Sequence, residues 1–231
     1  ALMVEYERTD DRLTLTRVGT RWLSNGINGG VASAASAHKL TVQEGFDRTD
    51  LATYAADRLE AAPSGPTLLT GVRQSHARGA RAGPVEAIVT AGVSNPAVLP
   101  PSGDPTAHPP EGSESRIEPG TVNVFVGTTQ ALSDSGLTEL LATTVEAKTA
   151  TLLDVVGCTG TTSDAVAVGC APDGDSAAFA GSATPVGNAT RICVREALSA
   201  ALESRYERSP PDPATTTDGI ETTGSATVFR P

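Results

Sequence analysis

A single lysine within a helical pattern is the first residue of this sequence that suggests chemistry. Among 17 lysine and arginine residues, only Lys39 and Lys148 are lysines. Lys148 shares its helical periodicity with Leu141, Val145 and Leu152, and an ammonium group on such an apolar stripe needs a carboxylate or a ligand as its partner. The alternative is a side chain whose stem packs on the helix while its ammonium group reaches water.

The segment from Gly157 to Asp164 places glycines and hydroxyl groups between a predicted helix and a predicted strand. Its hydroxyls, including that of Thr161, and its backbone N–H groups could bind an anion or a carbonyl oxygen. Asp164 would stand at the end of this loop. A turn in which Asp164 bonds only its own backbone is the alternative. A helix-to-strand turn rarely needs so many consecutive hydroxyls, which favours a functional loop.

Four further loops, at 24–30, 90–96, 120–123 and 180–185, have the same polar character. Together they predict a pocket lined by hydroxyl groups, amides and backbone N–H groups, which suits a large neutral ligand edged with carboxamides. We assign the following residues to this lining: Ser24, Asn25, Gly29, Thr90, Gly92, Ser94, Asn95, Asn123, Thr162 and Ser182.

Familiar catalytic signatures are missing from the sequence. There is no phosphate-binding loop with its lysine, no dinucleotide-binding glycine pattern, no serine-hydrolase elbow and no spaced pair of histidines for zinc. Cys158, Cys170 and Cys193 are odd in number and lack the spacing of a metal site or a disulfide framework. A thiolate nucleophile at Cys158 is less favoured than a packed cysteine, because no histidine is near it in sequence. We therefore predict no bound metal.

The charge balance limits the classes of partner. Acidic residues outnumber basic ones by 27 to 17, which gives a formal charge of -10. Such a field repels phosphate backbones and anionic lipid, so we expect neither nucleic acid nor membrane as partner. Acid excess together with lysine depletion is typical of proteins from salt-loaded cytoplasms; an acidic protein from a GC-rich genome is the alternative. No apolar run could span a bilayer and the N-terminal residues show no signal pattern, so we expect a cytoplasmic protein.

Periodicity and capping predict the elements that must position these residues. Alternating apolar and polar residues predict a hairpin over 2–7 and 13–17, and a short helix is expected over 50–59, capped near Thr49. A long helix should begin after Ser133 and end near residue 156. Its apolar stripe would consist of Leu137, Leu141, Val145, Leu152 and Val155.

A second long helix should run from Thr184 to about Arg205, with Pro185 in its first turn. Buried strands are expected over 67–72, 85–91, 121–126 and 165–169.

The fold class that follows is α+β, with a mixed, largely antiparallel sheet covered by the two long helices. A three-layer α/β arrangement is the alternative, because the first long helix leads directly into a strand. We expect a single catalytic domain over 1–205 with a Pro- and Gly-rich surface insertion at about 100–119. The Pro- and Thr-rich tail covers 206–231, and a final edge strand could form at 226–229.

Several short motifs occur in a fixed order along the chain. They are Trp22–Gly26 with Gly29–Gly30, Ala82–Glu86, Thr90–Pro96, Gly120–Asn123, Glu146–Thr149, Gly160–Val166 and Ala180–Gly187. The ordered set resembles the adenosylcobinamide amidohydrolases (the CbiZ family) of archaeal corrinoid salvage, over about residues 21–202. Ser163 stands where the family pattern more often has threonine, and we recognise no counterpart of the insertion and the tail in that pattern.

The resemblance implies hydrolysis of the amide that joins the aminopropanol arm of adenosylcobinamide to the corrin ring, which releases adenosylcobyric acid. The cobalt would arrive inside this small-molecule substrate, so no cofactor is expected. The number of subunits is left open, with a homo-oligomer as one option. Two rival functions stay open: a non-enzymatic corrinoid carrier, and an amidase for another small amide.

Amide hydrolysis needs a nucleophile, stabilisation of the oxyanion and a proton for the departing amine. Asp164 or Glu146 is our candidate for the general base that activates water. Lys148, with the amides and hydroxyls around Thr161, would hold the oxyanion. Direct attack by Thr161 or Ser24 is the alternative.

Overall fold

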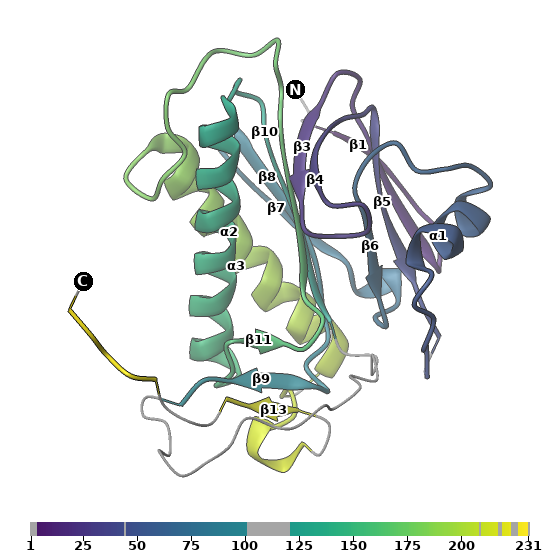
Figure 1. The fold of residues 1–231 in the computed structure, drawn as a ribbon, viewed down its shortest axis with the longest axis vertical. Coiled ribbons are helices and arrows are strands. Elements are labelled where there is room, and N and C mark those ends of the chain that lie inside the picture. The colour runs from purple at the N-terminus through teal and green to yellow at the C-terminus, as the bar shows by residue number, and fades with distance from the viewer. Residues whose placement is uncertain are drawn as a thin grey trace.

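Two β-sheets and a pair of long helices form three layers in the computed structural model (Figure 1). The structure describes residues 4–43, 45–100, 121–207, 209–216, 219–222 and 226–230. No helix in these ranges is long and apolar enough to cross a membrane.

The middle layer is a six-stranded sheet. Its strands are, in spatial order, β4 (Gly30–Ser33), β3 (Arg21–Ser24), β12 (Ala165–Cys170), β10 (Val122–Thr128), β8 (Val85–Ala91) and β7 (Arg78–Ala82). Only β10 and β12 pair in parallel; the other neighbours are antiparallel. The parallel pair arises because a long helix between the two strands carries the chain back to the same edge of the sheet. Both strands therefore begin side by side.

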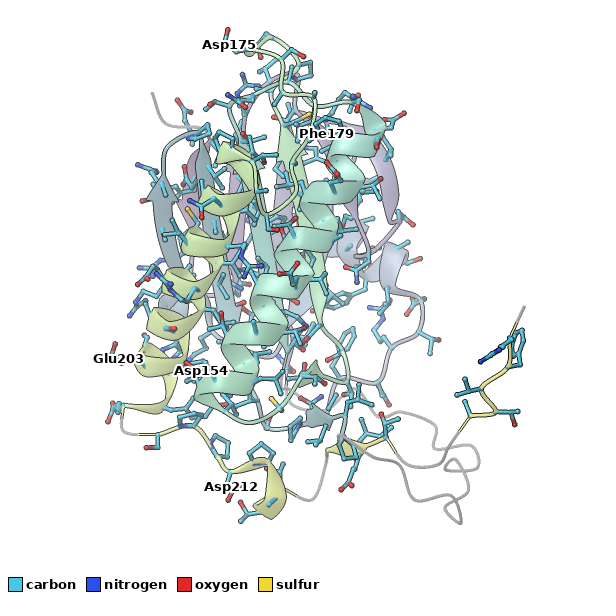
Figure 2. The ribbon with its side chains drawn as sticks, turned by 90° about the vertical axis from the view of Figure 1, so that its left-hand side faces the viewer. Asp154, Asp175, Phe179, Glu203 and Asp212 are labelled. Atoms are coloured by element: carbon cyan, nitrogen blue, oxygen red, sulfur yellow. The ribbon has the colours of Figure 1, made fainter. Side chains whose placement is uncertain are left out.

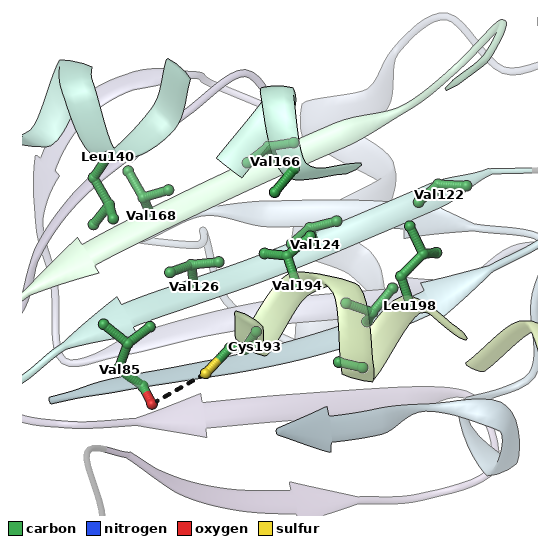
Figure 3. Close-up of a cluster of buried hydrophobic side chains, with 14 of the residues drawn as sticks. Val85, Val122, Val124, Val126, Leu140, Val166, Val168, Cys193, Val194 and Leu198 are labelled. Carbon is green, nitrogen blue, oxygen red and sulfur yellow. Dashed lines mark hydrogen bonds between the residues drawn. The ribbon is translucent and has the colours of Figure 1, made fainter. Parts of the chain in front are cut away.

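The helical layer covers one face of this sheet. It consists of α2 (Asp134–Val155) and α3 (Pro185–Tyr206), which lie side by side in Figure 2. Alternate residues of the strands, such as Val122 and Val124 of β10, point toward the helices and form the larger hydrophobic core. Figure 3 shows this cluster, in which the thiol of Cys193 lies 3.5 Å from the carbonyl oxygen of Val85.

The predicted caps of both long helices are confirmed. The hydroxyl of Ser133 accepts a hydrogen bond from the backbone N–H of Gly136 at 3.1 Å. Thr184 accepts one from Gly187 at 3.0 Å, with Pro185 in the first turn. These bonds satisfy N–H groups that have no partner within the helix, which fixes where each helix begins.

The other face of the six-stranded sheet is covered by a four-stranded sheet. Its order is β1 (Glu5–Arg8), β2 (Arg12–Thr16), β5 (Ser36–Thr41) and β6 (Thr67–Thr70). Leu13 and Leu68 from this sheet pack against Trp22 and Phe125 of the six-stranded sheet in a second, smaller core. The two aromatic rings meet edge to face, with their centroids 6.3 Å apart.

Short elements complete the described chain. They are α1 (Leu51–Leu59), the 3-10 turns η1 (Gln74–His76) and η2 (Pro213–Thr215), and a small sheet of β11 (Gly160–Thr161), β9 (Pro96–Val98) and β13 (Ile220–Glu221).

The predicted fold class is confirmed: the protein is α+β, with mixed, mostly antiparallel sheets and two long helices. The hairpin and the buried strands form as predicted, within a few residues at their ends. The α/β alternative is not what forms, because the third layer is a sheet rather than more helices. The predicted insertion lies outside the described residues except for Pro100.

Three local predictions were wrong. The N-cap of α1 is Asp50 rather than Thr49, and its side chain makes no capping bond. The described residues 226–230 form no strand, and the tail instead contributes β13, which pairs with β9.

The third error concerns the apolar stripe of α2. Val145 and Val155 are 40% and 42% exposed, and the buried face instead includes Thr144 and Thr151. Their hydroxyls donate to the carbonyl oxygens of Leu140 and Ala147, one turn earlier, at 2.7 and 2.8 Å. A threonine satisfied in this way can be buried without an unpaired polar group, so the stripe cannot be read from apolar residues alone.

A fully buried lysine lies between the two sheets. Lys39 of β5 is 0% exposed, and its Nζ atom has no hydrogen-bond partner among the residues that the structure describes. The amine lies 5.8 Å from the centroid of the Phe125 ring. Burial lowers the pKa of Lys39 from 10.5 to about 7, because the charged form loses its hydration.

Replacing this lysine should change how stability depends on pH. Between pH 7 and 10.5 the unfolded chain binds a proton that folded Lys39 does not bind, so the free energy of unfolding should rise with pH across this window and be flat below it. We expect Lys39→Met to raise that free energy at pH 7 by on the order of 4 kcal/mol and to remove the rise. Denaturant unfolding at fixed salt from pH 6 to 10.5 measures both effects.

Leu40→Met is the matched control, since Leu40 is also fully buried on β5 but carries no titratable group. It should shift stability by the same amount at every pH. A pH slope that persists unchanged in Lys39→Met would show that Lys39 is not the group responsible.

Candidate active site

The carboxylate of Asp164 is the centre of a polar network at the edge where β10 and β12 begin. Its Oδ1 atom accepts hydrogen bonds from the backbone N–H of Val122 at 3.0 Å and from the hydroxyl of Thr161 at 2.5 Å. Its Oδ2 atom accepts the backbone N–H of Thr161 at 3.1 Å and forms an ion pair with Lys148. Two donors on each oxygen fix the carboxylate and leave little room for another.

Helix α2 carries Lys148 into this network on its buried face. The side chains of Lys148 and Asp164 are only 8% and 12% exposed. Removing one partner of such a pair would leave the other charged and unpaired in a poorly hydrated place. The sequence-based requirement for a carboxylate beside Lys148 is therefore met by the structure.

Gly160 lets the loop pass close to this ion pair. A Cβ atom at this position would lie 2.7 Å from Oδ2 of Asp164 and 3.1 Å from Nζ of Lys148. The next loop fixes the same segment from outside, because the Asn95 amide donates to the Thr162 hydroxyl at 2.6 Å and the Thr162 N–H donates to the Asn95 carbonyl at 3.2 Å. The loops 90–96 and 157–164 thus meet, as the sequence predicted.

Polar residues on the other side fix the loop after β3 and join the two sheets at one point. The Asn25 side chain accepts a bond from the N–H of Val166 at 2.7 Å, and the Ser24 hydroxyl accepts one from Gly26 at 2.9 Å. The Asn123 amide donates to the carbonyl oxygen of Leu69 in β6 at 2.6 Å. Ser24 and Asn123 are buried, so the bonds described here support the walls of the site.

A pocket of about 270 Å³ opens beside Asp164, between the six-stranded sheet and β6. One part of its wall is polar and contains Thr121, Ser163 and Asp164, and the hydroxyls of Thr121 and Ser163 are hydrogen-bonded at 2.9 Å. Its apolar lining consists of Ile27, Val42, Phe46, Leu51, Leu68, Leu69 and Ala165. Since small-molecule sites usually span about 300 to 1,000 Å³, this pocket suits a small group or one arm of a larger molecule.

Glu146 is not part of this site. It lies exposed on α2 and pairs with Arg191 of α3, with side-chain exposures of 58% and 41%. Two residues along a helix point in nearly opposite directions, so Glu146 and Lys148 cannot both face the pocket. The geometry therefore does not support Glu146 as the general base.

Ser182 also lies elsewhere. It is exposed in the turn before α3, where the N–H of Ala180 donates to Glu139 in the first half of α2. Lys148 follows Glu139 by nine residues, which is about 13 Å along a helix. The loop 180–185 therefore does not join the pocket.

The remaining predicted lining residues support the surrounding loops and strands instead of lining the pocket. Thr90 and Gly92 are buried, and the N–H of Gly92 donates to the Thr121 carbonyl at 3.2 Å. A Cβ atom at Gly29 would lie 2.6 Å from the carbonyl oxygen of Ser24, so this loop needs a glycine there. Ser94 adjoins Asn95 in the loop that holds Thr162. Of the predicted lining residues, only Asn25 lines the pocket itself.

The apolar wall of the pocket was missed by sequence reasoning. Phe46 and Leu51 come from the region around α1, far from every polar motif, and Leu68 belongs to a strand that reads as ordinary core. The available signal was Phe46, one of only four phenylalanines in the chain, which packs on Tyr54 with centroids 4.8 Å apart.

The other candidate groups show no catalytic arrangement. Burial raises the pKa of the Cys158 thiol, which makes a thiolate less accessible. His38 is bonded to the hydroxyls of Thr14 and Ser36, on the four-stranded sheet. Within the described ranges, no three histidine, cysteine or acidic side chains are grouped to hold a metal ion.

Comparison with known proteins bears directly on this site. Residues 5–210 match the family model described as adenosylcobinamide amidohydrolase (CbiZ). The chain is also 48% identical to the adenosylcobinamide amidohydrolase of Halobacterium salinarum over 234 aligned residues, which cover 99% of this chain and 100% of that relative. Both matches span every element that builds the Asp164 network. The chain therefore belongs to the adenosylcobinamide amidohydrolase (CbiZ) family.

Proposed function

We propose that this protein hydrolyses the amide bond between the aminopropanol arm and the corrin ring of adenosylcobinamide, giving adenosylcobyric acid for cobamide salvage. Family membership supplies the reaction. The observation that supports it most directly is the buried pair of Lys148 and Asp164, whose carboxylate member lines a pocket of the size of a side arm. A carrier would need the pocket but not a buried pair of charges beside it.

The pocket volume suggests how the substrate is oriented. About 270 Å³ is far too small for a corrin ring, so the macrocycle stays outside and the arm enters. The apolar side chains Ile27, Phe46 and Leu69 suit the methyl and methylene groups of the arm. The amide then lies toward Asp164 and the hydroxyls of Thr121 and Ser163.

Asp164 is the general base in this proposal, because no other carboxylate lines the pocket within the described residues. It takes a proton from a water molecule whose oxygen attacks the amide carbon, and this proton passes to the amine nitrogen as the C–N bond breaks. Lys148 holds the carboxylate and places positive charge near the developing oxyanion. The Thr161 hydroxyl can rotate away without breaking backbone bonds, which frees Oδ1 for water.

The direct test is incubation of the purified protein with adenosylcobinamide, followed by mass spectrometry for adenosylcobyric acid and aminopropanol. Both products should form together. Tight binding without product would instead indicate a carrier, and neither binding nor product would indicate an amidase for another substrate.

The roles of the two predicted carboxylates can be separated by mutation. Asp164→Asn should lower kcat by at least about 100-fold, since it removes the base. Glu146→Gln should stay within about twofold, because Glu146 lies on the outer face of α2. Steady-state assays of both variants measure this difference, and equal losses in both would contradict the assignment.

Loss of folding must be distinguished from loss of chemistry in this experiment. The double variant Lys148→Met with Asp164→Asn removes both charges at once, so it leaves no unpaired buried charge, and the amide oxygen of Asn can still accept the Val122 N–H and the Thr161 hydroxyl. Its melting temperature should stay close to that of the wild type while turnover is lost. Activity retained in this folded variant would remove the pair from the mechanism.

The choice between water and Thr161 as nucleophile can also be tested. Thr161→Val keeps the shape of the side chain but removes the hydroxyl, and we expect kcat to fall by only about tenfold because one bond to Asp164 is lost. Intact-mass spectrometry of wild type mixed with substrate should show no acyl-enzyme. A covalent adduct in the wild type, together with complete inactivity of Thr161→Val, would establish threonine attack instead.

A further inference from the structure

A second and larger cleft, of about 540 Å³, lies between β1 and β7, the edge strands of the two large sheets. It shares no lining residue with the pocket beside Asp164. Its lining includes Tyr6, Arg8, Arg78, Arg81 and Glu86. Its excess of arginine over acid is unusual on a chain with a formal charge of -10.

Two of these arginines have no carboxylate partner. Arg81 forms an ion pair with Glu86, whose side chain is 6% exposed, at 2.9 Å. Arg8 and Arg78 form no ion pair with any described residue. Because the Arg81–Glu86 pair is neutral, the cleft retains the two positive charges of Arg8 and Arg78.

Backbone carbonyls hold these two guanidinium groups next to each other. Nη1 of Arg8 lies 3.5 Å from the carbonyl oxygen of Ser75, and Nη1 of Arg78 lies 3.0 Å from the same oxygen. Arg78 also donates to the Ala77 carbonyl at 2.8 Å and to the Ser204 hydroxyl. These anchors orient the groups before any ligand arrives, and they leave most of the charge uncompensated.

More than half of the described arginines are paired with a carboxylate; Arg12, Arg73, Arg205 and Arg230 are not, but none of these four lines the cleft. The seven arginines that form ion pairs with carboxylates are Arg17, Arg21, Arg48, Arg58, Arg81, Arg191 and Arg195. Two guanidinium groups held as close as those of Arg8 and Arg78 repel each other, and an anion bound between them would remove that repulsion.

Strand geometry keeps the acidic residues of β1 out of the cleft. Alternate residues of a strand face opposite sides, and in β1 it is Tyr6 and Arg8 that line the cleft while Glu5 and Glu7 do not. Tyr6 is 60% exposed at the rim and offers an aromatic surface to a ligand, whereas the Glu86 side chain is buried against Arg81. The cleft therefore combines two positive charges for an anionic group with an aromatic surface for the uncharged part of a ligand.

We propose that this cleft binds a small organic anion, whose carboxylate or phosphate group is held by Arg8 and Arg78. A guanidinium group presents two parallel N–H donors that match the oxygens of either group. The site is separate from the hydrolytic pocket and stands independently of the proposed reaction.

The test uses citrate as the carboxylate probe and pyrophosphate as the phosphate probe, each titrated calorimetrically into the protein at constant potassium chloride. One of the two should bind saturably at a single site and so identify the preferred group. Arg8→Gln and Arg78→Gln should each weaken that binding by about tenfold, since each removes charge-assisted hydrogen bonds. Added chloride should weaken binding in the wild type, because it competes and screens.

Arg195→Gln is the matched control, since Arg195 is an exposed arginine of α3 that pairs with its neighbour Glu196. It should leave probe binding unchanged. Arg78→Lys keeps the positive charge but loses the two parallel N–H donors of the guanidinium group, so this variant should bind the probe with intermediate affinity. The melting temperature of each variant checks that it is folded. Absence of saturable binding by both probes, or equal weakening in Arg195→Gln, would overturn the proposal.

Discussion

The buried ion pair between Lys148 and Asp164 is the interaction on which the rest of the site depends. Neither charge is stable there alone, so α2 must deliver the ammonium and the loop before β12 must deliver the carboxylate to one place. The parallel pairing of β10 and β12 makes this feasible, because it puts the N–H of Val122 at the same edge as Asp164. Gly160 then allows the loop to lie against the pair.

The four-stranded sheet turns this polar network into a pocket. Without β6 and the segment around Phe46, the Asp164 edge would face open water, where a carboxylate and an ammonium would interact weakly. Asn123 and the loop after Ser24 bridge the two sheets through single hydrogen bonds to β6. Apolar residues beside a fixed carboxylate are what an amide substrate needs, since they exclude competing water from the arm while leaving one face for the attacking molecule.

The sequence predicts the parts of this structure that depend on local rules. Helix caps at Ser133 and Thr184 and the need of Lys148 for a carboxylate follow from such rules, and the structure contains all of them. The four-stranded layer was not predicted as a whole, because β5 mixes its apolar residues with His38 and Lys39. Ser182 and Glu146 were misplaced for a different reason: a motif gives residues in order along the chain, not the direction in which a side chain points.

The two lysines of this arginine-rich chain are both buried, but in different electrostatic environments. The chain has 15 arginines and only two lysines, and both lysines are buried, at 0% and 6% exposure. An arginine at Lys39 would carry a larger guanidinium group that does not lose its proton in proteins, so it would bury an unpaired charge there. Lys148 forms an ion pair with Asp164, whereas the Lys39 amine has no hydrogen-bond partner among the described residues and its pKa is lowered by burial. The two lysines thus occupy opposite electrostatic environments. Lys148 is part of the candidate site, whereas Lys39 lies in the four-stranded sheet that covers it.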